Sequence, residues 1–113
     1  MYDFNFIDNE ELIDIFDNVL VIQDDIEKVT TIALTNKRLL FLDYLDINDG
    51  MEALRISRGV YTVRSKSVYY YINLYDIECV SKDNYYKIML KNNECINFDN
   101  DILFKLLLKC FEK

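Results

Sequence analysis

The chain has 113 residues, of which 51% are hydrophobic and 29% charged, a size and composition that predict one globular domain spanning residues 1–113. It contains no histidine, proline or tryptophan and only 2 glycines. These absences exclude the commonest general base, histidine metal sites and glycine-rich phosphate loops, so we expect no enzyme, cofactor or metal. A formal net charge of −7 also argues against binding to nucleic acid.

The chain carries 3 cysteines, Cys79, Cys95 and Cys110. An odd number without a Cys-x-x-Cys pair is neither a disulfide framework nor a zinc site, so we expect buried, reduced thiols. The start of the sequence lacks the basic leader of a signal peptide. Its apolar runs are also far shorter than the roughly 20 residues that cross a bilayer. These features together predict a cytoplasmic protein.

Charge is distributed unevenly along the chain. Residues 1–27 include nine acids and no base, whereas residues 55–72 include four bases and no acid. We name these four bases the basic island: Arg55, Arg58, Arg64 and Lys66. Two interpretations stay open, an ordinary solvated face or a site where guanidinium groups bind a phosphate or carboxylate.

Residues 9–17 are predicted to form a short helix within an N-terminal helical segment, 1–17. Asp8 is placed to cap this helix, and Glu11 follows three residues later as in a capping box. Apolar residues at 12, 15, 16 and 19 have helical spacing.

Residues 19–98 are predicted to form antiparallel strands. Polar turns at Asn36–Lys37 and Asn92–Asn93 each separate two β-rich runs, which is typical of hairpins. The expected strands lie at 19–23, 29–35, 38–45, 54–58, 60–65, 68–74, 85–91 and 94–98.

Residues 100–113 are predicted to form the strongest helix, capped by Asp99. Its apolar residues occupy most of the circumference, more than one core contact requires. We therefore expect part of this surface, including Leu103, Leu107 and Phe111, to contact the N-terminal helix or another subunit.

A tyrosine-rich stretch precedes residue 76. Tyr69, Tyr71 and Tyr75 alternate with apolar residues, so one strand would present tyrosines outward, a composition common at protein interfaces. The other interpretation is that these rings pack beneath the N-terminal helix with their hydroxyls in water.

Two segments resemble the bacterial PH-domain families and related GRAM-like domains. Residues 34–41, LTNKRLLF, resemble the LTNKRLIF hairpin of these families, and residues 74–80, LYDIECV, resemble their hydrophobic-x-x-I-x-x-V strand. The resemblance implies a mainly β (α+β) fold. This would be a PH-like antiparallel barrel of about seven strands with a short N-terminal helix and a closing C-terminal helix.

The family implies a binding module, because PH folds bind phosphoinositides, peptides or protein surfaces. Lipid-binding members carry basic residues on the first hairpin, where this chain instead has Asp24, Asp25 and Glu27. We therefore expect a non-catalytic module that acts through protein–protein contacts, including self-association as a homo-oligomer. The alternative is a peripheral membrane or anionic-ligand surface at the basic island.

Overall fold

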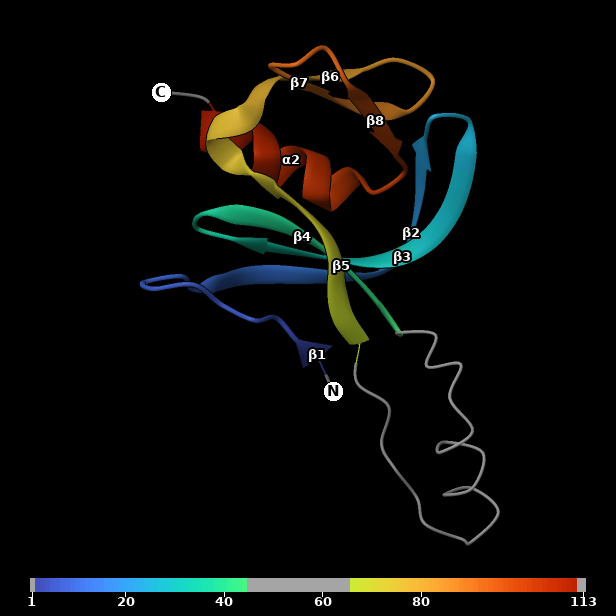
Figure 1. Cartoon of the computed structure of the whole chain (residues 1–113). Coiled ribbons are helices and arrows are strands. Elements are labelled where there is room, and N and C mark those ends of the chain that lie inside the picture. The colour runs from blue at the N-terminus through green and yellow to red at the C-terminus, as the bar shows by residue number, and fades with distance from the viewer. Residues whose placement is uncertain (1, 45–65, 112–113) are drawn as a thin grey trace, which may run out of the picture.

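An eight-stranded mixed sheet and one helix account for the structure that the computed structural model describes, residues 2–44 and 66–111 (Figure 1). The elements in chain order are β1 (Tyr2–Asp3), β2 (Leu12–Gln23), β3 (Ile26–Thr35), β4 (Arg38–Tyr44), β5 (Lys66–Asn73), the 3-10 helix η1 (Leu74–Asp76), β6 (Ile77–Lys82), β7 (Tyr86–Leu90), β8 (Cys95–Phe98) and α2 (Asp101–Phe111).

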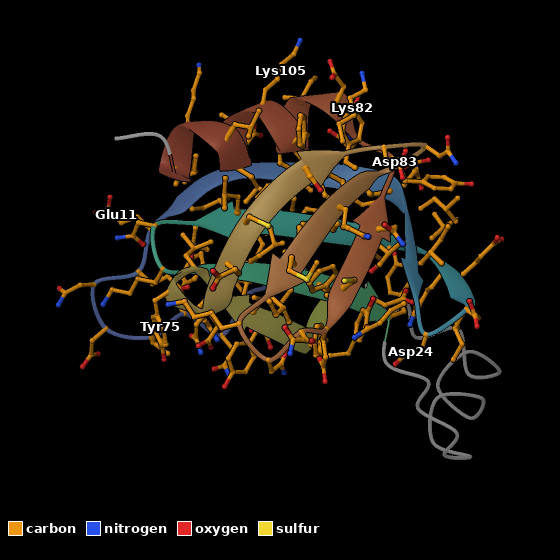
Figure 2. The ribbon with its side chains drawn as sticks, turned by 90° about the horizontal axis from the view of Figure 1, so that it is seen from above. Glu11, Asp24, Tyr75, Lys82, Asp83 and Lys105 are labelled. Carbon is orange, nitrogen blue, oxygen red and sulfur yellow. The ribbon has the colours of Figure 1, made fainter. Side chains whose placement is uncertain are left out.

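The strand order is β1-β5-β4-β3-β2-β8-β7-β6, with β1 parallel to β5 and every other pair antiparallel. The sheet folds over, so that β6–β8 lie above β4 and β5 (Figure 1), and α2 lies to one side of β6–β8, next to β6 (Figure 2). Its end strands do not pair with each other, so the predicted PH-like antiparallel barrel is wrong. The short η1 carries the chain from β5 to β6, but β6 then pairs only with β7.

The predicted N-terminal helix is also wrong, because its last residues belong to β2. A register shift between Phe16 and Val19 interrupts the pairing of β2 with β3, and Asn18 inside it has a φ of 58°. Phe16 and Val19 are therefore both buried although they are three residues apart. A bulged strand thus imitates helical spacing, because the extra residue breaks the alternation of faces.

The hairpin turns predicted from asparagine are confirmed. Asn36 and Lys37 separate β3 from β4, and Asn93, with a φ of 71°, lies between β7 and β8. β4 is buried on both faces: Leu39 and Phe41 belong to the main core, and Leu40 packs in a second cluster beneath the N-terminal segment. The strands predicted at 54–58 and 60–65 lie outside the described residues.

The predicted C-terminal helix is confirmed as α2, but its cap differs. The Asn100 side-chain oxygen accepts from the Leu103 N–H at 2.8 Å, as an N-cap does, whereas the Asp99 carboxylate accepts from the Leu20 N–H on β2 at 2.9 Å. Leu103 and Leu107 are fully buried against the sheet. Among the described residues, no helix has the length and apolarity needed to span a membrane.

Candidate functional site

A pocket of about 500 Å³ lies beside β5, within the roughly 300–1,000 Å³ typical of ligand pockets. It is lined by four β5 residues and by residues from η1 and the β7–β8 turn: Tyr70, Tyr71, Ile72, Asn73, Asp76, Leu90, Lys91, Asn92 and Glu94. The lining thus includes two tyrosines and several residues with amide or charged side chains. Such a mixture suits a peptide better than a purely apolar ligand.

The edge of β5 beside this pocket has free backbone groups. Leu74 N–H donates to the Lys37 carbonyl at 3.0 Å, and Asn73 pairs with Arg38 one position earlier. Because hydrogen bonding alternates along an antiparallel ladder, the N–H and C=O of Asn73 and Tyr71 point away from β4. Within the described chain, β1 borders only the start of this edge, so it is uncovered at the pocket.

One face of the Tyr71 ring contacts the guanidinium group of Arg38. The Arg38 guanidinium carbon lies 5.0 Å from the centre of the Tyr71 ring, a cation–π contact. Tyr71 nevertheless remains 50% exposed, so half of the residue is accessible to a partner. A rigid, half-exposed ring of this kind is a typical anchor for a protein partner.

Arg38 is held by a buried ion pair with Glu10. Its Nη2 lies 2.6 Å from Glu10 Oε1, and its Nε donates to Oε2 at 2.8 Å, a two-pronged contact. Thr35 O–H and Ile7 N–H also donate to this carboxylate. The Arg38 hydrogen bonds above all hold the pKa of Glu10 down, at about 2, although burial opposes the shift. The same pairing raises the pKa of Arg38.

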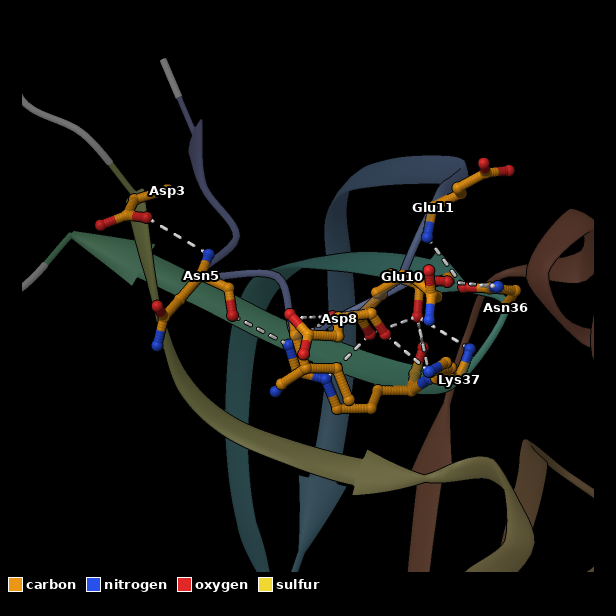
Figure 3. A network of polar contacts seen from close by, with 11 residues as sticks. Asp3, Asn5, Asp8, Glu10, Glu11, Asn36 and Lys37 are labelled. Atoms are coloured by element: carbon orange, nitrogen blue, oxygen red, sulfur yellow. Dashed lines mark hydrogen bonds and ion pairs between the residues drawn. The ribbon is translucent and has the colours of Figure 1, made fainter.

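The N-terminal segment is thereby fixed to the β3–β4 hairpin (Figure 3). Lys37 Nζ donates to the Asp8 carbonyl at 2.6 Å, and the Asn36 amide bonds both to the Asn9 carbonyl and to the Glu11 N–H. The residues that we predicted to begin a helix instead hold the Asn36–Lys37 turn.

Of the basic island, Arg55, Arg58 and Arg64 lie outside the described residues. Lys66 is on β5, where its Nζ donates to Thr31 Oγ1 at 2.8 Å and lies 3.6 Å from Asp17 Oδ1. Asp17 also accepts from the Tyr2 hydroxyl. Hydrogen bonding, first of all from Thr31, lowers the pKa of Asp17. Lys66 therefore links β5 to β2 and β3 within the chain, and Asp17 connects β1 to the same network.

The predicted outward tyrosines are exposed, which confirms their orientation. Tyr69, Tyr71 and Tyr75 are 42%, 50% and 70% exposed, but only Tyr71 lines the pocket. Tyr69 donates to Thr30 Oγ1, and Tyr75 lies on η1 at the edge of the molecule (Figure 2).

Leu103 and Leu107 contribute to the core of their own chain rather than to an exposed surface. Phe111 is the last residue of α2. Ile102, on the same helix, is far more exposed than Leu103 and Leu107, at 60%.

The cysteines differ from the prediction that they are buried, because Cys79 and Cys110 are exposed and Cys95 is half-buried. Cys95 Sγ lies 3.4 Å from Met89 Sδ on the neighbouring strand. No group of three cysteine or acidic side chains in residues 2–44 and 66–111 is arranged to hold a metal ion.

Sequence reasoning missed Arg38, Glu10 and Asn73 as parts of the site. Arg38 lies in the predicted strand 38–45 and in the segment that resembles PH domains, and Glu10 lies in the predicted helix 9–17, but neither prediction pairs the two residues. A basic residue inside an otherwise apolar strand is a signal for a buried partner, because an isolated charge is costly there. Nothing in the sequence shows that this partner lies 28 residues away.

Comparison with models of known families and with curated proteins gives no match to this chain. The resemblance of residues 34–41 and 74–80 to bacterial PH domains stays a prediction.

Proposed function

We propose that the chain is a non-catalytic binding module that acts through protein–protein contacts, including contacts between copies. The observation that carries this proposal is the free edge of β5 beside a pocket with a half-exposed tyrosine. An extended segment of a partner would form backbone hydrogen bonds with Tyr71 and Asn73, and its alternate side chains would enter the pocket.

β1 supports this mode of binding, because it already adds to the same edge. Tyr2 and Asp3 run parallel to β5 and pair with Lys66 and Ser67. A partner strand would continue along β5 where β1 stops. The net charge of −7 further favours a partner segment with basic residues.

Asn73→Pro tests the proposal with little disturbance of the fold. The φ of Asn73 is −69°, close to the value near −65° that proline requires, so the substitution removes mainly an N–H that points away from β4. Asn73→Ala is the matched control, because it also loses the side-chain contact with Asp76 but keeps the N–H.

The probe is a displayed library of short random peptides selected on the full chain. We expect the selected peptides to bind Asn73→Pro roughly tenfold more weakly than Asn73→Ala, as the loss of a backbone hydrogen bond predicts. A selection that yields no binding peptide, or peptides that bind both variants equally well, would contradict binding at this edge.

A further inference from the structure

The pocket beside β5 combines apolar residues of the core with charged residues at the surface. Ile72 and Leu90 line it, are 4% and 6% exposed, and belong to the main core. The charged lining residues Asp76, Lys91 and Glu94 are all exposed, so they form a rim that borders the solvent. A side chain that suits such a pocket has an apolar stem and a charged end.

The two acidic residues of this rim come from segments that the backbone holds together. Lys91 N–H donates to the Asp76 carbonyl at 2.9 Å, which joins η1 to the β7–β8 turn. Within the turn, Leu90 N–H donates to the Glu94 carbonyl at 2.8 Å, and Asn93 N–H donates to the Leu90 carbonyl at 3.0 Å. The backbone at Asp76 and Glu94 is therefore in place before a ligand binds, which lowers the ordering cost of binding.

Both carboxylates have unused hydrogen-bonding capacity. The Asp76 carboxylate accepts from the Asn73 side-chain amide at 3.4 Å, a long contact. The Glu94 side chain has no hydrogen bond or ion pair to any described residue, because only its backbone takes part in the turn. A carboxylate has about four acceptor positions, so both groups can accept from a donor in the pocket.

The third charged residue of the rim, Lys91, has the opposite sign. No ion pair joins it to Asp76 or Glu94 in the part of the chain that the structure describes. Its long, flexible stem allows the ammonium group to turn toward water. Two carboxylates against one ammonium group leave the rim with a negative balance, so a cationic ligand is favoured over an anionic one.

We propose that this pocket takes an arginine or lysine side chain of the partner peptide, whose stem packs on the buried apolar lining and whose cationic end binds Asp76 and Glu94. The inference rests on the proposed function, of which it names the residue type that the pocket selects. Strand pairing along Tyr71 and Asn73 would fix the position of this residue in the peptide. Arginine should bind more tightly than lysine, because one guanidinium group can donate to two carboxylates.

The first test uses a displayed library of random peptides selected on the full chain. We expect the aligned peptides to carry arginine or lysine at one fixed position. In a synthetic peptide of the consensus sequence, glutamine at this position should weaken binding roughly tenfold, as followed by fluorescence polarisation. Exchange between arginine and lysine should change the affinity less, because the positive charge is kept.

Variants of the rim test which groups of the chain make the contact. Asp76→Asn and Glu94→Gln should each weaken binding of the consensus peptide roughly three- to tenfold. Lys91→Gln should instead strengthen it by about threefold, because a repulsive charge is removed. The matched control is Glu78→Gln on β6, which removes one exposed acid outside the pocket lining and should leave the affinity within about twofold. All four residues are exposed, so the fold should tolerate these substitutions.

A charge exchange tests the contact directly. The original chain should reject a consensus peptide that carries glutamate in place of the basic residue. Glu94→Arg should bind this glutamate peptide more tightly than it binds the original peptide. Such a reversal requires the two exchanged groups to interact, so it separates direct recognition from a general effect of charge.

The outcomes separate this inference from the proposed function. Peptides that respond to Asn73→Pro but bind Asp76→Asn and Glu94→Gln unchanged would overturn the basic-residue pocket and leave binding at β5 in place. Acidic peptides that require Lys91 would have the same consequence. Equal losses for Glu78→Gln and Glu94→Gln would show that the charge of the whole chain, rather than the pocket, attracts the peptide. A selection that yields no binding peptide would overturn both proposals.

Discussion

The two end strands of the sheet differ in how much of their own chain lies beside them. At the β5 end, the N-terminal segment reaches the edge twice, through β1 and through the buried pair of Glu10 and Arg38. At the β6 end, the exposed residues Cys79 and Lys82 line an edge that has no further strand in the described structure. The N-terminal segment thus organises the β5 end, whereas at the β6 end the element of the described structure that lies beside the edge strand is α2.

Burial makes the ion pair at the β5 end stronger than an exposed pair elsewhere in the chain. The side chains of Arg38 and Glu10 are 7% and 0% exposed, whereas those of Lys105 and Asp101 on α2 are 69% and 55% exposed. Coulomb attraction is weakened far less by solvent inside a protein than at its surface. The first pair therefore fixes the N-terminal segment, and the second contributes little.

Glu10→Ala should have the largest effect, because it leaves the buried guanidinium of Arg38 without its partner. We expect the free energy of unfolding to fall by about 3–5 kcal/mol, measured by urea denaturation. Support for the Tyr71 ring should be lost at the same time, so peptide binding at β5 should weaken.

The neighbouring Glu11→Ala is the matched control. The Glu11 side chain is exposed, and its links to the hairpin are made by its backbone, so we expect a change within about 0.5 kcal/mol. Equal losses for the two variants would mean that charge in this segment, rather than the buried pair, holds the β5 end together.

Low pH should break the ion pair of Glu10 and Arg38 without a mutation. The pKa of Glu10 is about 2 in the folded chain and 4.5 without its partners, so its stabilisation is fully present above pH 4.5. It is lost as the pH falls toward 2, because the unfolded chain then binds the proton more readily. The difference corresponds to about 3 kcal/mol.

Glu10→Gln should be less stable near neutral pH but lose less stability between pH 4.5 and pH 2. The measurement is urea denaturation of both proteins across this range. Parallel curves for the two proteins would show that other carboxylates cause the acid sensitivity.

The local pattern of apolar and polar residues was enough to predict some helices and strands. It could not predict features that depend on contacts between residues distant in the sequence. Alternation at 85–91 and the apolar periodicity of 100–113 predicted β7 and α2, because each depends on side chains within one element. The bulge at Asn18 broke that rule within β2. The open sheet depends on which strands meet at its ends, which no local pattern records.

The candidate site, like the fold, could be predicted from the sequence only in part. The exposure of Tyr71 followed from alternation along β5. Its support by Arg38, and the pairing of Arg38 with Glu10, need the N-terminal segment to cross the hairpin. Sequence spacing cannot show that crossing, because the two segments meet only after the sheet has formed.

Asp17→Asn should have the smallest effect on the free energy of unfolding. It weakens the exposed contacts through which Asp17 connects β1 and β2 to β5. The Asp17 side chain is 47% exposed, and its bonds to Tyr2, Thr31 and Lys66 compete with water. We expect a loss below about 1 kcal/mol. The pKa of Tyr2, which the hydrogen bond to Asp17 raises, should return toward its ordinary value, as followed by NMR titration of the tyrosine rings. A loss as large as that of Glu10→Ala would show that β1, rather than the buried pair, organises this edge.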